Sequence, residues 1–418
     1  MTDTGLNADL AERYGTPLYV YDLDRVAAAR RDLFAALPDG VEVYYALKAN
    51  PHPDLARALR EDDGTGHACR AEISSTGELA AAVTAGYDPA ACLYTGPGKT
   101  PGELAAALDA GVRTFSVESL SDLRHVGEAA LAHGATARCL LRVNSATAGA
   151  STGIRMTGRP SQFGIDGETL PALMPDLAAV PGTRLAGAHY FTMSNAKDED
   201  HLLTELEAAI GSAAKLAEDT GLPLELLDIG GGFSAPYATP GERPRYGKLR
   251  GELEHVLDLH LPGWRSGAPR IAVESGRYLV ADSGRLLTRV VNVKDSRGSR
   301  FVIADAGINT VGGLSGLGRL LPAAVRPDTA APEAEPASLV GPLCTPGDLL
   351  ARDIGLPAAE PGDLLSIPNV GAYGPTASLL GFLSRPAPAE AVVRGTDVVT
   401  VSRLELHRVP QAPRGGHG

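Results

Sequence analysis

The chain has 418 residues, of which 44% are hydrophobic and 21% are charged, a composition typical of a globular protein large enough for two domains. Its net charge of −12 argues against a protein that binds the phosphate backbone of nucleic acids. We find no signal peptide, no apolar run of membrane-spanning length, and no metal-type or redox-type spacing among Cys69, Cys92, Cys139 and Cys344. We therefore expect a reduced, cytoplasmic protein with no nucleic-acid or membrane partner.

Short apolar segments alternate with amphipathic helical segments over residues 24–276. Eight such strand-and-helix units in about 250 residues match the count of a (β/α)8 barrel. A doubly wound open sheet is the alternative, although it rarely needs eight units. We predict an α/β fold with a TIM-like barrel over 24–276, whose strands lie near residues 43–48, 67–74, 92–97, 114–119, 138–144, 184–191, 224–231 and 270–276.

The pattern changes after Gly276. Segments 285–294, 301–305 and 397–401 read as strands without regular helices between them. We predict a β-rich second domain formed by residues 1–23 and 277–409, followed by a disordered tail over 410–418.

The segment Val41–Pro51 is a mostly apolar strand that ends in one lysine, Lys48, before the chain-breaking pair Asn50-Pro51. A lysine at such a position can extend to solvent or pair with a carboxylate. It can also act as a neutral amine that forms a Schiff base with a carbonyl compound. This segment alone leaves both interpretations open.

Barrel enzymes place their chemistry at the C-terminal ends of the strands, and here those ends are polar and glycine-rich. Glycines at a strand end let backbone N–H groups approach a phosphate, although a tight turn is the simpler interpretation. Phosphate sites after strands 7 and 8 recur in barrels, and both of those strand ends carry glycine here. The strand-end residues are Lys48, Glu72, Arg142, Asn144, His189, Asp228, Gly230, Gly231, Gly232, Glu274, Gly276 and Arg277.

Two later segments carry further candidate residues. The turn-rich segment 341–348 contains Cys344, and the segment 369–374 places Tyr373 between glycines. Each signal is weak by itself, because most lone cysteines are inert small hydrophobic residues.

Together these residues resemble the fold-type III pyridoxal phosphate (PLP) decarboxylases, which include the diaminopimelate, ornithine and arginine decarboxylases. The resemblance covers nearly the whole chain and implies an alanine-racemase-like barrel with a C-terminal β-rich domain. The motifs that carry it are Tyr45-Ala46-Leu47-Lys48-Ala49-Asn50, Ser75-Thr76-Gly77-Glu78-Leu79, Ser161-Gln162-Phe163-Gly164-Ile165, Gly230-Gly231-Gly232-Phe233, Glu274-Ser275-Gly276-Arg277, Cys344 with Asp348, and Gly371-Ala372-Tyr373-Gly374.

The resemblance also implies roles for individual residues. Lys48 would hold PLP, and Glu274 would face the pyridine nitrogen. Cys344 would come from the partner subunit of a head-to-tail homodimer and return a proton to carbon after CO2 leaves. The other implied cofactor-binding residues are Phe191, Ser194, Gly231, Gly232, Gly276, Arg277 and Tyr373, and the implied substrate residues are Arg319, Thr345, Asp348 and Tyr373.

The substrate-side residues depart from the diamine-type enzymes. Thr345 follows the cysteine where those enzymes have an acidic residue, and Phe191 replaces a stacking histidine. The segment 312–319 replaces the one that grips diaminopimelate. These features look more like the secondary-metabolism branch, which includes the glutamyl-carrier-protein decarboxylase of butirosin biosynthesis and the exosortase-associated decarboxylases.

We therefore expect α-decarboxylation of an L-amino acid or an amino-acid-derived substrate in specialised metabolism. Its far end would be neutral or acidic, and it would be either free or bound to a carrier protein. The alternatives are a diaminopimelate decarboxylase, an amino-acid racemase of the same fold, or a non-enzymatic binding protein. A racemase needs a second base opposite the lysine, and its motif set lacks the Cys344 segment. A binding protein typically loses cofactor residues that this chain keeps.

Overall fold

The computed structural model describes residues 3–62, 64–145, 154–155, 160–312, 325–328 and 336–410. The chain forms two compact units. One contains residues 21–285 and 368–373, and the other contains residues 1–20, 286–367 and 374–418. The first unit extends past the predicted barrel bounds of 24–276 at both ends and adds a short segment from far along the chain. The tail residues 411–418 lie outside the described part.

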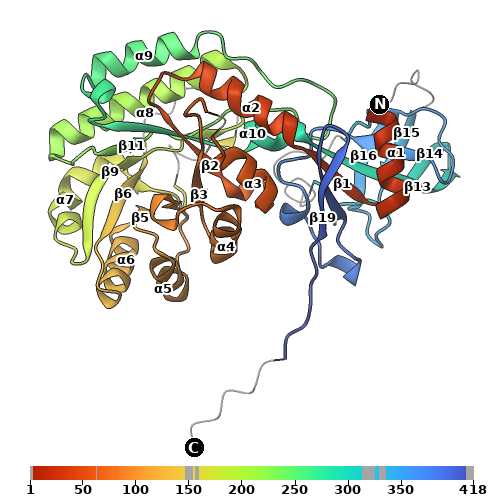
Figure 1. The fold of residues 1–418 in the computed structure, drawn as a ribbon, viewed down its shortest axis with the longest axis horizontal. Helices are drawn as coiled ribbons and strands as arrows, with labels where there is room; N and C mark the ends of the chain where they lie inside the picture. The colour runs from red at the N-terminus through yellow and green to blue at the C-terminus, as the bar shows by residue number, and fades with distance from the viewer. Residues whose placement is uncertain are drawn as a thin grey trace, which may run out of the picture. The chain divides into compact units, whose positions relative to one another are not determined.

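The first unit is a closed barrel of eight parallel strands, as predicted (Figure 1). The strands pair in the order β5-β4-β3-β2-β12-β11-β9-β6, and β6 pairs back onto β5 to close the sheet. The short strand β8, Ile165–Asp166, adds to the outside of this order beside β6. The barrel strands are β2 (Glu42–Ala46), β3 (Arg70–Ile73), β4 (Leu93–Tyr94), β5 (Thr114–Val117), β6 (Ala137–Asn144), β9 (Thr183–His189), β11 (Leu226–Asp228) and β12 (Arg270–Ser275).

Helices follow most of these strands and lie outside the barrel (Figure 1). Local sequence sets their ends: α5 begins with a capping box between Thr100 and Glu103 and ends at Gly111, whose φ of 107° suits glycine. The outer helices are α2 (Leu23–Ala36), α3 (Pro53–Arg60), α4 (Thr76–Ala85), α5 (Pro101–Ala110), α6 (Leu120–Ala132), α7 (Leu170–Ala178), α8 (Glu199–Thr220) and α9 (Leu249–His260), and the short α10 (Arg277–Val280) follows β12.

The barrel interior contains a layer of buried apolar side chains from six strands. Its members are Tyr44, Leu93, Leu140, Ala186, Leu226 and Ala272. The buried polar residues His189, Asp228 and Glu274 come later along their strands than the apolar layer, so they lie toward the C-terminal ends. The apolar layer therefore closes the barrel beneath the polar end.

The second unit is built on a β-sheet with the order β16-β15-β14-β13-β1-β18-β19, and β17 pairs with β13. Helix α1, Asp3–Tyr14, packs Leu6 and Leu10 against Leu18 and Leu287 of this sheet. The structure confirms the predicted β-rich character, and the predicted strands correspond to β13, β14 and β19. The strands are β1 (Leu18–Asp22), β13 (Gly284–Ser296), β14 (Ser299–Ala304), β15 (Pro336–Val340), β16 (Leu349–Gly355), β17 (Leu364–Ile367), β18 (Ala389–Arg394) and β19 (Asp397–Arg403).

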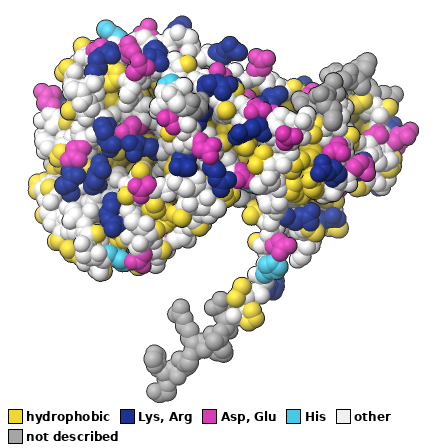
Figure 2. All heavy atoms as spheres, viewed as in Figure 1, with side chains coloured by type: hydrophobic (Ala, Val, Ile, Leu, Met, Phe, Trp, Pro, Cys, Tyr) yellow, Lys and Arg dark blue, Asp and Glu magenta, His cyan; other side chains and the backbone are white. Residues whose placement is uncertain are grey.

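Acidic and basic side chains are interspersed over the face of the molecule shown in Figure 2, without a large patch of one sign. Among the described residues, no helix has the length and apolar character needed to cross a bilayer.

Candidate active site

Lys48 lies in the 3-10 turn η1, Leu47–Ala49, directly after β2. Hydrogen bonds fix this strand end. The Tyr45 hydroxyl donates to the carbonyl of Asn50 at 2.6 Å, and the Asn50 amide donates to the carbonyl of Gly371 at 2.8 Å. The backbone N–H of Tyr373 donates to the carbonyl of Ala49 at 2.7 Å. These bonds bring Tyr373, more than 300 residues along the chain, beside Lys48.

Two buried carboxylates face the Lys48 amine. Its Nζ lies 3.5 Å from Oε2 of Glu72 and 3.8 Å from Oε2 of Glu274. It also lies 5.0 Å from the centre of the Phe191 ring. Burial opposes the charge on Lys48, but the two carboxylates outweigh it and raise the pKa of the amine. The free lysine is therefore an ammonium paired with carboxylates, as the first interpretation predicts, and the Schiff-base interpretation requires this amine to give up a proton.

The two carboxylates have opposite pKa shifts. Burial raises the pKa of Glu72 to about 7, although Lys48 acts in the other direction. Burial also acts against charge on Glu274, yet Lys48 and His189 lower the pKa of Glu274 to about 2. Oε1 of Glu274 lies 3.2 Å from Nε2 of His189. Glu274 is therefore anionic at neutral pH and can stabilise a protonated nitrogen that binds next to it.

The glycines at the ends of β11 and β12 permit close backbone approach. A Cβ on Gly230, whose φ is 79°, would lie 2.2 Å from the carbonyl oxygen of Tyr190. A Cβ on Gly231 would lie 2.3 Å from the carbonyl oxygen of Glu274. The backbone at these positions packs too closely for any residue with a side chain. The C-terminal ends of β11 and β12 can therefore adopt this conformation only with glycine at these positions.

One cavity collects the residues around Lys48, and all of them belong to the barrel unit. On its wall the Arg277 guanidinium lies 4.7 Å from the centre of the Tyr373 ring. Nε of Arg277 and Oγ of Ser275 are buried and have no hydrogen-bond partner among the described residues. The lining residues are Ala46, Lys48, Phe191, Ser194, Asn195, Gly232, Phe233, Glu274, Ser275, Gly276, Arg277 and Tyr373.

These observations fit PLP. An amine and an anionic carboxylate lie at one part of the cavity. At another part lie glycine backbone and two groups, on Ser275 and Arg277, that have no hydrogen-bond partner in the described part of the chain. Phosphate binds to such donors, because backbone N–H groups and a guanidinium both favour an anion.

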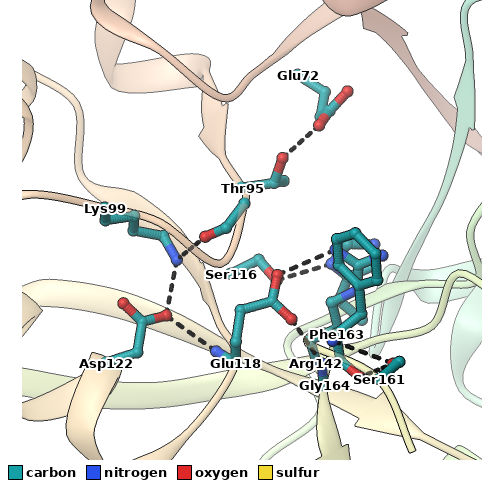
Figure 3. Close-up of polar contacts among 12 residues, drawn as sticks. Glu72, Thr95, Lys99, Ser116, Glu118, Asp122, Arg142, Ser161, Phe163 and Gly164 are labelled. Atoms are coloured by element: carbon teal, nitrogen blue, oxygen red, sulfur yellow. Dashed lines mark hydrogen bonds and ion pairs between the residues drawn. The ribbon is translucent and has the colours of Figure 1, made fainter. Parts of the chain in front are cut away.

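Arg142 and Glu118 belong to a network of polar contacts (Figure 3), and Arg142 also contacts Phe191 of the cavity wall. The Arg142 guanidinium lies 4.8 Å from the centre of the Phe163 ring and 5.8 Å from that of Phe191. Nη1 of Arg142 lies 3.0 Å from Oε1 of Glu118, whose Oε2 accepts the N–H of Gly164 at 2.6 Å. Arg142 and Glu118 therefore attach the predicted Ser161–Ile165 motif to the cavity.

Most predicted cofactor residues line this one cavity. Lys48, Phe191, Ser194, Gly232, Glu274, Gly276, Arg277 and Tyr373 belong to it, and Gly231 packs on the backbone of Glu274 behind it. Sequence reasoning assigned no role to Glu72, Arg142 or His189, although their positions at strand ends were visible. Asn195, with a left-handed φ of 60°, gave no sequence signal.

Of the predicted substrate residues, Tyr373 lines the cavity, whereas Thr345 and Asp348 belong to the β-rich unit, as does the predicted catalytic Cys344. Cys344 is exposed, and Oγ1 of Thr345 accepts the N–H of Gly347 at 3.2 Å. Asp348 is buried, and its two oxygens accept the N–H groups of Ile308 and Leu343. Asp348 therefore holds its own loop, and its contact with substrate stays a prediction. Arg319 lies outside the described residues.

Comparison with known proteins adds independent evidence. A family model described as "Pyridoxal-dependent decarboxylase, pyridoxal binding domain" matches residues 23–281. The chain is 33% identical over 402 residues to an L-glutamyl-[BtrI acyl-carrier protein] decarboxylase of Niallia circulans, with coverage of 94% of this chain and 92% of that relative. It is 35% identical over 402 residues to a diaminopimelate decarboxylase of Methanothermobacter thermautotrophicus, with coverage of 95% and 91%.

The solved structure of diaminopimelate decarboxylase from Helicobacter pylori complexed with L-lysine matches with a TM-score of 0.79 and 26% identity, covering 95% of each chain. The barrel, the cavity around Lys48 and these matches agree with one another. The chain belongs to the pyridoxal-dependent decarboxylases, and it is an amino acid decarboxylase with PLP as its cofactor.

Proposed function

We propose that this enzyme removes the α-carboxyl group of an L-amino acid or amino-acid derivative whose far end is neutral or acidic. The observation that carries the proposal is the Lys48 amine facing Glu72 and Glu274 in a cavity with unpaired anion-binding groups. The substrate is either free or bound to a carrier protein, and the pathway belongs to specialised metabolism. A cytoplasmic location is part of the same proposal.

The cavity residues divide the work of holding the cofactor. Lys48 would hold PLP, and Glu274 would face its ring nitrogen. Phe191 would stack on the ring. The residues that would hold the phosphate end are Ser194, Gly231, Gly232, Gly276, Arg277 and Tyr373. When bound, PLP supplies an electron sink for the charge left by the departing CO2.

Glu72 has a role in this arrangement that follows from its pKa. The Lys48 amine must lose and regain protons as the substrate amine replaces it. Glu72 lies 3.5 Å from Nζ, and its pKa of about 7 lets it hold or release a proton at neutral pH. It is suited to this exchange, whereas Glu274 stays ionised.

Cys344 is the acid that returns a proton to carbon, and in this proposal it comes from the second subunit of a homodimer. The other three cysteines are unsuitable. Burial raises the pKa values of the Cys69, Cys92 and Cys139 thiols to about 12, while Cys344 is exposed. A turn that carries an exposed thiol can present it to an active site.

The residues after Cys344 support a substrate without a distal amine. Thr345 carries no charge to bind such an amine. Both oxygens of Asp348, the next carboxylate along the chain, already accept backbone N–H groups. The relative from Niallia circulans is named for a glutamyl group on an acyl-carrier protein, which agrees with this choice. Diaminopimelate is the second candidate, because a relative of 35% identity is a diaminopimelate decarboxylase.

The test is CO2 release from a matched set of substrates: L-glutamate, a glutamyl thioester on a carrier protein, L-ornithine and meso-diaminopimelate. We expect turnover of the glutamyl substrates and no turnover of the two amines. Lys48→Ala should lose activity by about 10³-fold or more and lose the absorbance of lysine-bound cofactor.

Preferential turnover of diaminopimelate would replace the substrate proposal with the second candidate. Thr345→Asp is the matched variant, and it should shift preference toward the amine substrates. D-amino acid product without CO2 would indicate a racemase and overturn the reaction itself.

A further inference from the structure

The two oxygens of Glu274 face different partners. The side chain is 2% exposed, and Oε2 is the oxygen nearest Lys48 in the cofactor cavity. Oε1 lies 3.2 Å from Nε2 of His189. Among the described residues, both atoms are buried and neither makes a hydrogen bond, so at 3.2 Å they are in close contact without hydrogen-bond geometry. The imidazole is therefore the group next to Oε1, on the side of Glu274 away from Lys48.

His189 is itself fixed by one hydroxyl. Its side chain is 1% exposed, and its Nδ1 lies 2.7 Å from Oγ of Ser116, a fully buried residue of β5 that is labelled in Figure 3. When Ser116 donates to Nδ1, the ring hydrogen is on Nε2 and points to the carboxylate. In the imidazolium both nitrogens carry hydrogen, so Nε2 again faces Glu274 with an N–H. The remaining tautomer would set a lone pair against an anion, which is unfavourable.

A third carboxylate lies near this contact but has another partner. The ligand atoms of His189, Asp228 and Glu274 lie within 4.8 Å of one another. Oδ1 of Asp228 accepts the N–H of Gly230 at 2.9 Å, and burial together with Glu274 raises the pKa of Asp228 to about 7. A cation among these three side chains would compete with PLP for Glu274. The cluster therefore belongs to the support of the cofactor site.

We propose that His189, oriented by Ser116, is a positioning residue for the cofactor. Its Nε2–H fixes Oε1 of Glu274 and keeps Oε2 directed into the cavity as an anion for the ring nitrogen. The inference rests on the proposed role of Glu274. Without the N–H, burial would favour the neutral acid and a turned carboxyl group, and neither would hold a protonated ring nitrogen.

Two amide variants separate the two ends of the imidazole. In His189→Gln the side-chain amide reaches the position of Nε2, so it can still donate to Glu274. In His189→Asn the shorter amide reaches only the position of Nδ1, so it can contact Ser116 but not Glu274. We expect the dissociation constant of PLP from the apo-protein to rise about 10–100-fold in His189→Asn and less than about threefold in His189→Gln.

A cofactor analogue with carbon in place of the ring nitrogen tests whether His189 affects PLP binding through Glu274 and that nitrogen. Binding of this deaza-PLP should be the same in wild type and His189→Asn, because there is no nitrogen for Glu274 to hold. Equal weakening for both ligands, or no weakening for PLP, would overturn the inference. Ser116→Ala is a milder variant that should weaken the binding of PLP but not that of the deaza analogue. It replaces His189→Asn in this test if His189→Asn does not fold.

Glu274→Ala distinguishes failure of this inference from failure of the proposed site. If Glu274→Ala binds PLP and the deaza analogue with unchanged affinities, Glu274 does not face the ring nitrogen and the proposed site is wrong. If Glu274→Ala weakens the binding of PLP but not of the deaza analogue, while His189→Asn changes neither affinity, the proposed cofactor site is supported and the positioning role of His189 is wrong.

Discussion

At the scale of single residues, the site depends on two glutamates that differ in charge although both are buried beside Lys48. Glu274 has a second cationic or donor group, His189, on its far oxygen. Oε1 of Glu72 accepts a hydrogen bond from the Thr95 hydroxyl, a weaker stabilisation of charge (Figure 3). One carboxyl group is therefore a permanent anion, and the other titrates near neutral pH.

The stability of the apo-enzyme should fall as pH rises from about 5 to about 7.5. The ordinary pKa of Glu72 is 4.5, and its pKa in the folded protein is about 7, so the folded state binds more protons in this interval. Asp228, shifted from 3.8 to about 7 by burial, adds to the same slope. The free energy of unfolding in urea, measured at the two ends of this pH interval, checks the prediction. Glu72→Gln should lose less stability across the interval than wild type, and an equal loss would show that Glu72 is ionised throughout.

At the scale of elements, the strand ends were readable from sequence and the connections between them were not. Parallel strands buried on both faces give continuous apolar runs, so the eight segments and their polar ends, such as Lys48 and Glu274, could be predicted. Asn195 lines the cavity from a left-handed backbone position and was not predicted. Tyr373 was predicted from its motif, but its left-handed backbone was not. Strands β15 to β18 were not predicted: β15 and β17 span only 5 and 4 residues, and β16, Leu349–Gly355, mixes charged and apolar residues.

The ion pair between Glu118 and Arg142 should be the main attachment of the segment around Gly164. Both side chains are less than 10% exposed, so Glu118→Ala leaves a buried guanidinium without its partner. We expect a loss of roughly 3–5 kcal/mol in the free energy of unfolding. Hydrogen exchange at the Gly164 amide should also accelerate, because that N–H donates to Glu118.

The surface pair Arg184–Glu225 provides the control for this experiment, since both side chains are nearly half exposed. Glu225→Ala should cost less than about 1 kcal/mol. A similar small cost for Glu118→Ala, with unchanged exchange at Gly164, would mean that other contacts hold the segment.

At the scale of the whole molecule, the residues proposed for the reaction are divided between the two units. The barrel unit contains every residue that lines the cofactor cavity, including Tyr373 from the segment 368–373. The β-rich unit contains Cys344 and Thr345. Motifs in the sequence predict both sets. The family resemblance alone implies that Cys344 would serve Lys48 of the partner subunit, because that arrangement depends on assembly rather than on local pattern.

Heterodimers of two inactive variants should therefore recover activity. Lys48→Ala and Cys344→Ala are co-expressed with different tags, and dimers that carry both tags are purified. If Cys344 serves the Lys48 of the other subunit, one site of each heterodimer carries both substitutions and the other is intact. Such a dimer should show about half of wild-type CO2 release, whereas each variant alone falls by about 10²-fold or more. If Cys344 serves its own chain, every site carries one substitution and the heterodimer stays inactive, which would contradict the shared site.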